Sequence, residues 1–355
     1  MKIITKNVET IGSKNTSESI TYEYETPADR FWTKSIHKND DGEISKTVVR
    51  ELGDDRTPVK ELTYEFGDII TKTKIVKYSA ENGKLLYEKV FDGTPEDNKP
   101  TTVREYEYAG ERLVREKAEV YFADPDFVNE DGNRIRYSYV YRYVQLTRNC
   151  PQSDEHNLFV EELRSYANED RGDIKKGDLA YIQFTEFDSD GMPVYFKSTE
   201  PKDEHHAVEA WYKIERNDDG TVSAIKGFDN KEMNKFSTSS TARIFTYGDG
   251  GMIESYLEAK YTPDTGEYDR QHAGMIFDWK FPATRDCGLA RAEVESRSYC
   301  FHRQLLTLEQ EKIRKYSDGT LVVEEYEGTK NGAFDPDFND TKLTRRTTYK
   351  YEIIK

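Results

Sequence analysis

The sequence predicts a mainly β protein, an extended antiparallel meander of hairpin repeats, and three observations lead to this fold class. Asp-Gly and Asn-Gly pairs recur along the whole chain, apolar and polar residues alternate between them, and 13% of the residues are aromatic. Gly adopts positive φ without steric cost, so these pairs favour hairpin turns, and alternation with period two is the pattern of a strand.

Residues 77–93, which read K-Y-S-A-E-N-G-K-L-L-Y-E-K-V-F-D-G, show the repeating unit. Two runs rich in Ile, Val, Leu, Phe and Tyr flank Asn82-Gly83, and the pair predicts a type I′ turn. Further Asp-Gly or Asn-Gly pairs stand at residues 41–42, 92–93, 131–132, 190–191, 219–220, 249–250, 318–319 and 331–332. This recurring sequence pattern predicts that strands and turns follow one another along the chain.

The expected strands of the first part of the chain are separated by short gaps. They are residues 2–5, 20–25, 31–38, 44–52, 59–66, 69–78, 85–91, 103–108, 112–122 and 134–147. The last is the strongest and places Tyr137, Tyr139, Tyr141 and Tyr143 on one face. Such an aromatic ladder commonly packs within a sheet, and it can also serve as a contact surface.

Residues 153–171 are the best helix candidate in the chain. Ser153 can cap the first turn, acidic residues follow it, and Leu158, Leu163 and Tyr166 belong to one apolar stripe. The sequence therefore predicts one short helix between two hairpin arrays.

The two arrays have landmarks in the same order, which favours a division into two similar halves. I-H-K-N-D-D-G-E-I-S at 36–45 returns as I-E-R-N-D-D-G-T-V-S at 214–223, and D-P-D-F at 124–127 returns at 335–338. A tandem duplication or convergent hairpins would both give this order, and we favour duplication. The expected parts are an N-terminal hairpin array at 1–150, a helical joint at 151–178 and a C-terminal array at 179–355, with an insertion near 270–310.

Residues 77–93 and 315–332 resemble the degenerate hairpin repeats of bacterial YD-repeat (RHS-type) proteins and of MORN-variant antitoxin-like proteins. The resemblance covers about a third of the chain and rests on the short pattern Y-x-x-x-G-x-L. It implies an extended β-scaffold with an immunity- or antitoxin-like role, and it carries over no catalytic residue.

Charge and composition narrow the class of protein. Charged residues make up 34% of the chain, against about 25% in typical domains, so a thin sheet partly solvated on its faces fits best. The sequence leaves open whether that sheet is open or closed. The net charge of −16 disfavours direct nucleic-acid binding. It would suit a basic protein partner, although solubility alone also explains it.

Cysteine usage and hydropathy bear on the compartment. Cys150, Cys287 and Cys300 form an odd set without a C-x-x-C motif, which favours a reducing, cytoplasmic location. No run is apolar enough for a membrane span, so no membrane contact is expected. The chain starts without a signal peptide, but a leader that had been trimmed would leave the same sequence.

No motif for phosphate cradling, metalloprotease or hydrolase chemistry is present, so we expect no cofactor and no metal. Asp335, Asp337 and Asn339 have the spacing of a calcium loop, but Asp340 and Arg346 stand where its Gly and Glu should be. An Asp-Pro turn is the better interpretation. His205 and His206 could not both bind one metal ion from a regular strand, because neighbouring strand residues face opposite sides. The acidic and His cluster at 203–206 is instead expected to be a surface loop.

These observations favour a non-enzymatic protein-binding or scaffold protein with the four tyrosines as contact surface. Two alternatives remain open. A glycan-binding or glycan-active protein would use Trp32, Trp211 and Trp279 as stacking platforms. An enzyme of unrecognised type would centre on Cys300 and His302, which share a strand face.

Overall fold

The computed structural model describes most of the chain, and all of its regular elements are strands. The described residues are 2–11, 15–65, 67–79, 81–96, 99–110, 112–146, 158–201, 203–235, 242–248, 253–262, 267–280, 294–302, 305–317, 319–328 and 341–352. Within these ranges, side chains are described except at 203–206, 254–262, 267–280, 294–302, 305–317, 327–328, 341–342 and 352. The described residues contain no helix that could cross a membrane.

In the described part of the chain twenty-two strands form one sheet, and their bounds are as follows. The first eleven are β1 Lys2–Thr10, β2 Thr16–Glu23, β3 Lys34–Lys38, β4 Ile44–Leu52, β5 Pro58–Glu65, β6 Ile69–Tyr78, β7 Leu85–Asp92, β8 Thr102–Ala109, β9 Arg112–Tyr121, β10 Ile135–Tyr143 and β11 Leu158–Tyr166. The others are β12 Leu179–Phe187, β13 Pro193–Glu200, β14 Asp203–Arg216, β15 Val222–Phe228, β16 Ala242–Tyr247, β17 Ile253–Thr262, β18 Glu267–Lys280, β19 Val294–His302, β20 Leu305–Ser317, β21 Thr320–Gly328 and β22 Thr341–Glu352.

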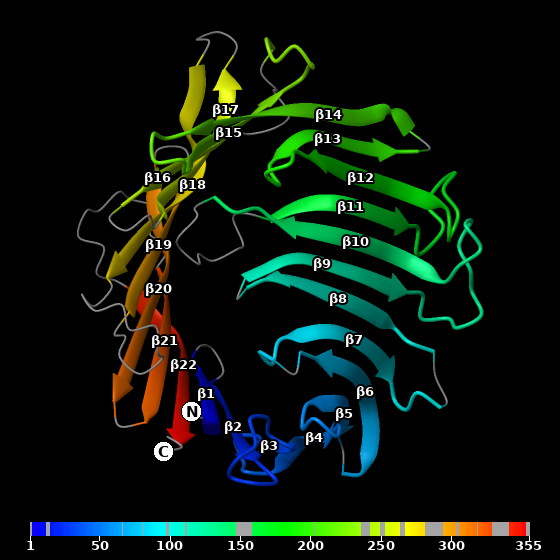
Figure 1. Cartoon of the computed structure of the whole chain (residues 1–355), viewed down its shortest axis with the longest axis vertical. Coiled ribbons are helices and arrows are strands. Elements are labelled where there is room, and N and C mark those ends of the chain that lie inside the picture. Colours follow the sequence, from blue (N-terminus) through cyan, green and yellow to red (C-terminus); the bar gives the residue numbers. More distant parts are fainter. Residues whose placement is uncertain are drawn as a thin grey trace.

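The predicted antiparallel hairpin meander is confirmed, and the sheet closes on itself. Consecutive strands pair antiparallel, for example β6 with β7 and β7 with β8. The first and last strands also pair, with Lys6 opposite Tyr349 and Val8 opposite Thr347. Figure 1 shows β6–β14 stacked along one side and β18–β22 along the other, with both termini close together where β22 meets β1. This closure leaves neither terminal strand as a free edge, where another chain could pair.

The register gives the closed sheet two distinct faces. Starting from Glu88, cross-strand partners lead through Arg104, Ala118 and Tyr139 to Leu163 on β11. Paired residues point to the same side of a sheet, so these five residues share one face. Glu88 is 5% exposed and Ala118 is 1% exposed.

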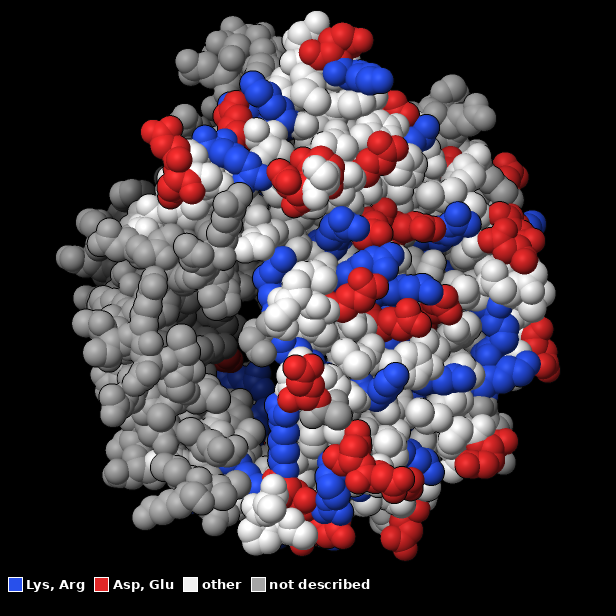
Figure 2. Space-filling model, in the orientation of Figure 1, with Lys and Arg blue, Asp and Glu red and all other residues white. Residues whose placement is uncertain are grey.

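The opposite face is open to water. It carries Glu107 and Lys213, whose side chains are 60% and 57% exposed. We call the shielded face the inner face and the open one the outer face, because side chains crowd most on the concave side of a closed sheet. Figure 2 shows positive and negative side chains interleaved over the region of β8–β14, as expected for a solvated face.

The hairpin turns are built on Gly, but not as type I′ turns. At Asn82-Gly83 only Gly83 has positive φ (69°), and the hairpin closes between the N–H of Ser79 and the carbonyl of Lys84 at 2.8 Å. A type I′ turn needs positive φ at both central residues and a two-residue loop. The predicted turn type is therefore wrong, while the predicted hairpin is present.

The predicted helix at 153–171 is wrong for every residue of it that lies in β11. β11 pairs with β10 and β12, and residues 153–157 lie outside the described residues. Between Val160 and Glu162 the register with β10 shifts, which is the mark of a β-bulge. At a bulge, the alternation of side chains between the two faces of the strand shifts by one residue. Apolar residues can therefore stand three and four positions apart in the sequence, which resembles the apolar stripe of a helix. The structure does not test the predicted division into two halves.

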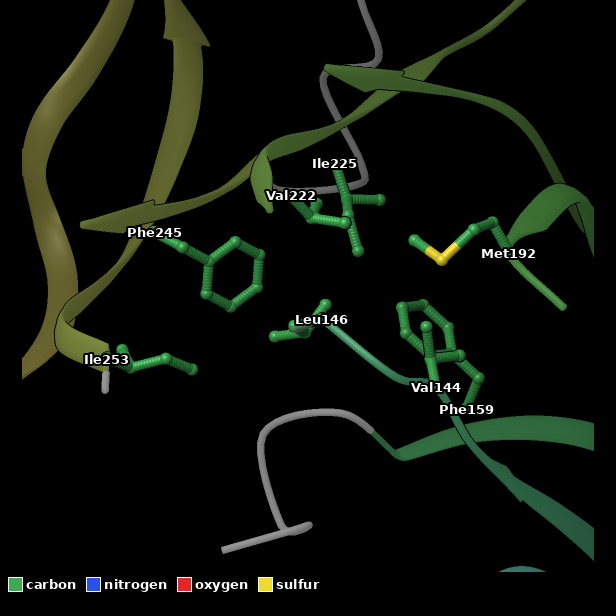
Figure 3. Close-up of a cluster of buried hydrophobic side chains, with 8 residues drawn as sticks. All are labelled: Val144, Leu146, Phe159, Met192, Val222, Ile225, Phe245 and Ile253. Atoms are coloured by element: carbon green, nitrogen blue, oxygen red, sulfur yellow. The ribbon is translucent and has the colours of Figure 1, made fainter. Parts of the chain in front are cut away.

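The main hydrophobic core lies where the chain leaving β10 meets β15–β17. Figure 3 shows the buried side chains of Val144, Leu146, Phe159, Met192, Val222, Ile225, Phe245 and Ile253 converging there. The N–H of Val222 donates to the carbonyl of Leu146 at 3.2 Å, which fixes the two segments to each other. Away from this cluster, cross-strand pairs contribute to the stability of the described strands.

Gly177 is required by both backbone conformation and space. Its φ is +88°, and a Cβ added there would lie 2.8 Å from the Phe127 ring. We expect Gly177→Ala to lower the free energy of unfolding by about 2 kcal/mol. Gly132→Ala is the matched control, because Gly132 has φ +75° with no atom near an added Cβ, and it should cost about 1 kcal/mol. Equal losses in urea unfolding would contradict this assignment.

An ion pair joins the connection between β2 and β3 to the turn before β5. Arg56 donates to Asp29 through Nε at 3.1 Å and through Nη2 at 2.8 Å, and the N–H of Thr26 donates to the same carboxylate at 2.6 Å. Arg56 has a left-handed backbone (φ 63°), which is costly for a residue with a side chain. Its hydrogen bonds with Asp29 offset that cost.

The same ion pair makes stability depend on pH. The hydrogen bond from Arg56, opposed by burial and assisted by Thr26, lowers the pKa of Asp29. Asp29 therefore contributes stability above its unfolded pKa of about 3.9, and this contribution is lost as pH falls through its lower folded pKa. The difference in unfolding free energy between the wild type and Asp29→Asn should be constant from pH 7 to about 5 and shrink below about 4. Urea unfolding at a series of pH values measures it, and a difference that does not change down to pH 2 would argue against the role of Asp29.

Candidate binding surfaces on the two faces of the sheet

The four predicted tyrosines of β10 lie on the inner face as a ladder. The rings of Tyr139 and Tyr141 stack with centroids 4.3 Å apart, and Tyr137 lies 5.4 Å from Tyr139 at a tilt of 45°. All four are half-buried. They lie on the same face because β10 is regular from Tyr137 onward, and strand residues two apart share a side.

Glu116 of β9 fixes two hydroxyl groups of this ladder. The Tyr139 hydroxyl donates to its Oε1 at 2.6 Å, and the Tyr143 hydroxyl donates to its Oε2 at 3.3 Å. Burial, and then the hydrogen bond to Glu116, raises the pKa of Tyr139. Tyr139 therefore stays a neutral donor, and the ladder is ordered before anything binds.

An alternating row of charges crosses the inner face beside the ladder. Arg50, Glu61 and Lys74 are successive cross-strand partners on β4, β5 and β6. Glu88 then bridges Lys74 at 3.6 Å and Arg104 at 2.5 Å. We call these five residues the inner charge row. Opposite charges placed directly across strands specify register, because a slip by one residue would move them to the outer face.

Several interactions with Glu88 and Tyr139 together outweigh the effect of burial at Arg104. Burial lowers the pKa of the guanidinium, but hydrogen bonds to Glu88 and Tyr139 and the charges of these groups raise it, so the pKa of Arg104 is raised overall. Arg104 and Glu88 are therefore held as an ion pair. The inner charge row therefore holds opposite charges in fixed positions on the inner face, rather than offering a site for proton transfer.

Trp211, the second predicted aromatic site, lies on the outer face away from the ladder. Its ring is 5.1 Å from that of Tyr195, which in turn lies 5.7 Å from Phe184. We call Phe184, Tyr195 and Trp211 the outer aromatic row. It crosses β12, β13 and β14, and its rings come from strands whose pairing the sequence did not reveal. Only Trp211 could be named beforehand.

Trp32 occupies a third, separate place. The Arg50 guanidinium lies over its ring at 3.5 Å, and the Tyr22 ring contacts it at 5.7 Å. One face of the indole is therefore covered by the inner charge row. The structure thus keeps Trp32 and Trp211 apart rather than bringing them into one site.

Several predicted site residues lie outside the described side chains. Trp279 is in β18, and Cys300 and His302 are in β19, where only the backbone is described. The predicted surface loop at 203–206 is wrong, because these residues begin β14. The loop at 335–340 is not among the described residues. Its counterpart forms the predicted Asx turn, in which Asp124 accepts the N–H of Asp126 at 3.0 Å.

The described residues contain no group of three or more His, Cys, Asp or Glu side chains that could hold a metal ion. Their pockets are lined largely by polar side chains. The pocket beside Tyr106 and Tyr108 has a volume of about 640 Å³ and is lined also by Asn82 and Lys84. What the described geometry offers is binding through aromatic rings, carboxylates and cations.

Comparisons with known proteins identify no family. No protein-family model and no curated protein matches the chain. Among solved structures, it is similar to TcdB2-TccC3 without its hypervariable C-terminal region at 9% identity and a TM-score of 0.28, over 97% of this chain and 17% of that one. It is similar to a porin-like protein from Bacteroides uniformis at 9% identity and a TM-score of 0.24, over 99% and 96%. The Tc holotoxin pore of Photorhabdus luminescens gives 10% identity and a TM-score of 0.16 over 91% and 23%.

This chain thus spans less than a fifth of the TcdB2-TccC3 chain. The scores are too low to assign a repeat type, and the resemblance to YD-repeat or MORN-variant proteins stays a prediction. The described residues form an all-β hairpin meander, which is compatible with a non-enzymatic scaffold.

Proposed function

We propose that this protein is a non-enzymatic β-scaffold that binds a segment of another protein at the tyrosine ladder of its inner face. The observation that carries the proposal is a ladder of four half-buried tyrosines, in which Glu116 binds the hydroxyls of Tyr139 and Tyr143 and ring contacts join Tyr137, Tyr139 and Tyr141. Tyr is enriched among residues that dominate binding energy, and a ring already held in place loses little entropy on binding. An ordered ladder is suited to such contacts.

The chemistry of the partner follows from charge. The net charge of −16 would attract a basic protein over long range, and Glu116 adds a carboxylate within the ladder. Lys and Arg side chains of such a segment would lie over tyrosine rings as cation–π contacts. A role as an immunity- or antitoxin-like partner is the finer form of this proposal, supported by the resemblance of the hairpin repeats.

The test uses a purified bait and a variant that spares Glu116. Tyr137→Ser combined with Tyr141→Ser removes two rings while Tyr139 and Tyr143 keep their hydrogen bonds. A partner recovered in stoichiometric amount by the wild type should bind this variant at least tenfold more weakly, whereas Tyr195→Ser on the outer face should bind normally. Failure to recover any partner, or equal binding by both variants, would contradict the proposal.

A further inference from the structure

The outer aromatic row lies on the solvated face, and its neighbouring rings are tilted by 59° and 46° to one another. Phe184, Tyr195 and Trp211 are half-exposed on adjacent strands, at centroid spacings of 5.7 and 5.1 Å. Below them Phe228, the cross-strand partner of Trp211, is only 4% exposed. The row is thus anchored at one end by a buried ring and is open to water along the rest.

Two ion pairs lie beside the row. Lys197 lies 3.0 Å from Glu209, which also accepts the Tyr195 hydroxyl at 3.0 Å. Lys226 lies 2.7 Å from Glu215 further along the same strands. Hydrogen bonds from Lys197 and then from Tyr195 lower the pKa of Glu209, so this carboxylate stays ionised. These pairs offer fixed hydrogen-bond donors and acceptors, and the exposed Glu186, the cross-strand partner of Tyr195, adds a carboxylate beside them.

Aromatic rings bordered by ion pairs favour some classes of ligand over others. A protein that covered the row would have to remove water from these ion pairs, which is costly for charges taken into an interface. A polyhydroxylated ligand can replace that water with its own hydroxyl groups. Its C–H faces can meanwhile stack on the aromatic rings. A polyanionic ligand is disfavoured, because the chain carries a net charge of −16.

We infer that the outer aromatic row is a binding platform for a neutral polysaccharide, with Trp211 and Tyr195 as the stacking residues and Glu209 and Lys197 as hydrogen-bonding groups at its border. The platform is independent of the protein-binding ladder, because the two lie on opposite faces of the sheet. Trp32 is not part of it, since Arg50 covers its ring at 3.5 Å.

Native gel electrophoresis through soluble polysaccharides tests the inference directly. The probes are hydroxyethylcellulose, mixed-linkage β-glucan, xyloglucan and galactomannan, with polygalacturonate as the anionic comparison. At least one neutral polymer should retard the wild type, and Trp211→Ala should weaken that binding at least tenfold. Trp32→Phe is the matched control and should be retarded like the wild type. Because Trp211 is the cross-strand partner of the buried Phe228, Tyr195→Ala and Lys197→Met serve as second variants that lie further from the buried ring.

Four results would overturn the platform. The first is a wild type that runs freely in all four neutral polymers, and the second is retardation by polygalacturonate alone. The third is glycan binding by both Trp211→Ala and Tyr195→Ala that equals that of the wild type. The fourth is a protein partner whose binding is lost in Trp211→Ala. The last would make the row a protein interface. Tyr137→Ser with Tyr141→Ser should leave glycan binding intact, so failure of this inference and failure of the proposed protein-binding role are distinguishable.

Discussion

Phe159→Ala is expected to lower the free energy of unfolding by about 3–4 kcal/mol, the largest loss we expect from a single substitution. Phe159 is 8% exposed in the cluster of Figure 3. Its ring meets that of Tyr212 edge to face at 6.4 Å, and the Arg243 guanidinium lies over it at 4.7 Å. Removing the ring leaves a cavity beside Tyr212 of β14 and Arg243 of β16, in a cluster that also includes residues of β15, β17 and the segment after β10. Such a cavity cannot collapse easily.

Phe184→Ala is the matched control for this loss. Phe184 stands on the neighbouring strand β12 but faces outward and is half-exposed. Its removal should cost about 1 kcal/mol, mainly through contact with Tyr195. Urea denaturation followed by far-ultraviolet circular dichroism compares the two. Similar losses would mean that the cluster around Phe159 is not the main core.

Glu88→Gln is expected to cost about 2 kcal/mol, although it changes the side chain's volume very little. The Glu88 side chain is 6% exposed and serves both Lys74 and Arg104. Neutralising it leaves two cations on the inner face without their counter-charge. Breaking a fully buried pair costs about 3–5 kcal/mol, and we reduce this figure because Lys74 and Arg104 are 37% and 35% exposed.

A double-mutant cycle separates pairing from packing at this site. Arg104→Gln combined with Glu88→Gln should recover about 1 kcal/mol relative to additivity, since the unpaired cation is removed. Glu107→Gln is the control, because its pair with Arg115 lies on the outer face and it is 60% exposed; it should change stability by less than about 0.5 kcal/mol. Additive losses in the cycle would show that Glu88 and Arg104 do not act as a pair.

The features of this fold that depend on residues close together in the chain could be predicted from the sequence. Asp41-Gly42 and Asn82-Gly83 mark hairpins that are present, because a Gly with positive φ leaves a local signature. Alternation likewise places Tyr139 and Tyr141 on one face. The error at β11 has a local cause as well, since the bulge near Val160 gives a strand the spacing of a helix.

What the sequence could not supply is pairing between distant segments. Lys6 meets Tyr349 only because the sheet closes, and no pattern in either strand records that partner. The outer aromatic row has the same origin, since Tyr195 and Trp211 become neighbours through the register of β13 with β14. The inner charge row could be seen in the sequence only as scattered Lys, Arg and Glu.

Closure of the sheet is the central claim, because it defines the inner and outer faces on which both proposed surfaces depend. Asn7 and Thr348 are cross-strand partners of β1 and β22. Directly opposed strand residues have the separation that a disulfide requires. In a chain whose three cysteines are replaced by Ser, Asn7→Cys with Thr348→Cys should form an intramolecular disulfide under mild oxidation. The product should be a monomer that migrates faster on a non-reducing gel and reverts with reductant. Asn7→Cys with Lys213→Cys should not cross-link. Free thiols in the first pair, or disulfides only between molecules, would show that the sheet is open and would remove the basis for its two faces.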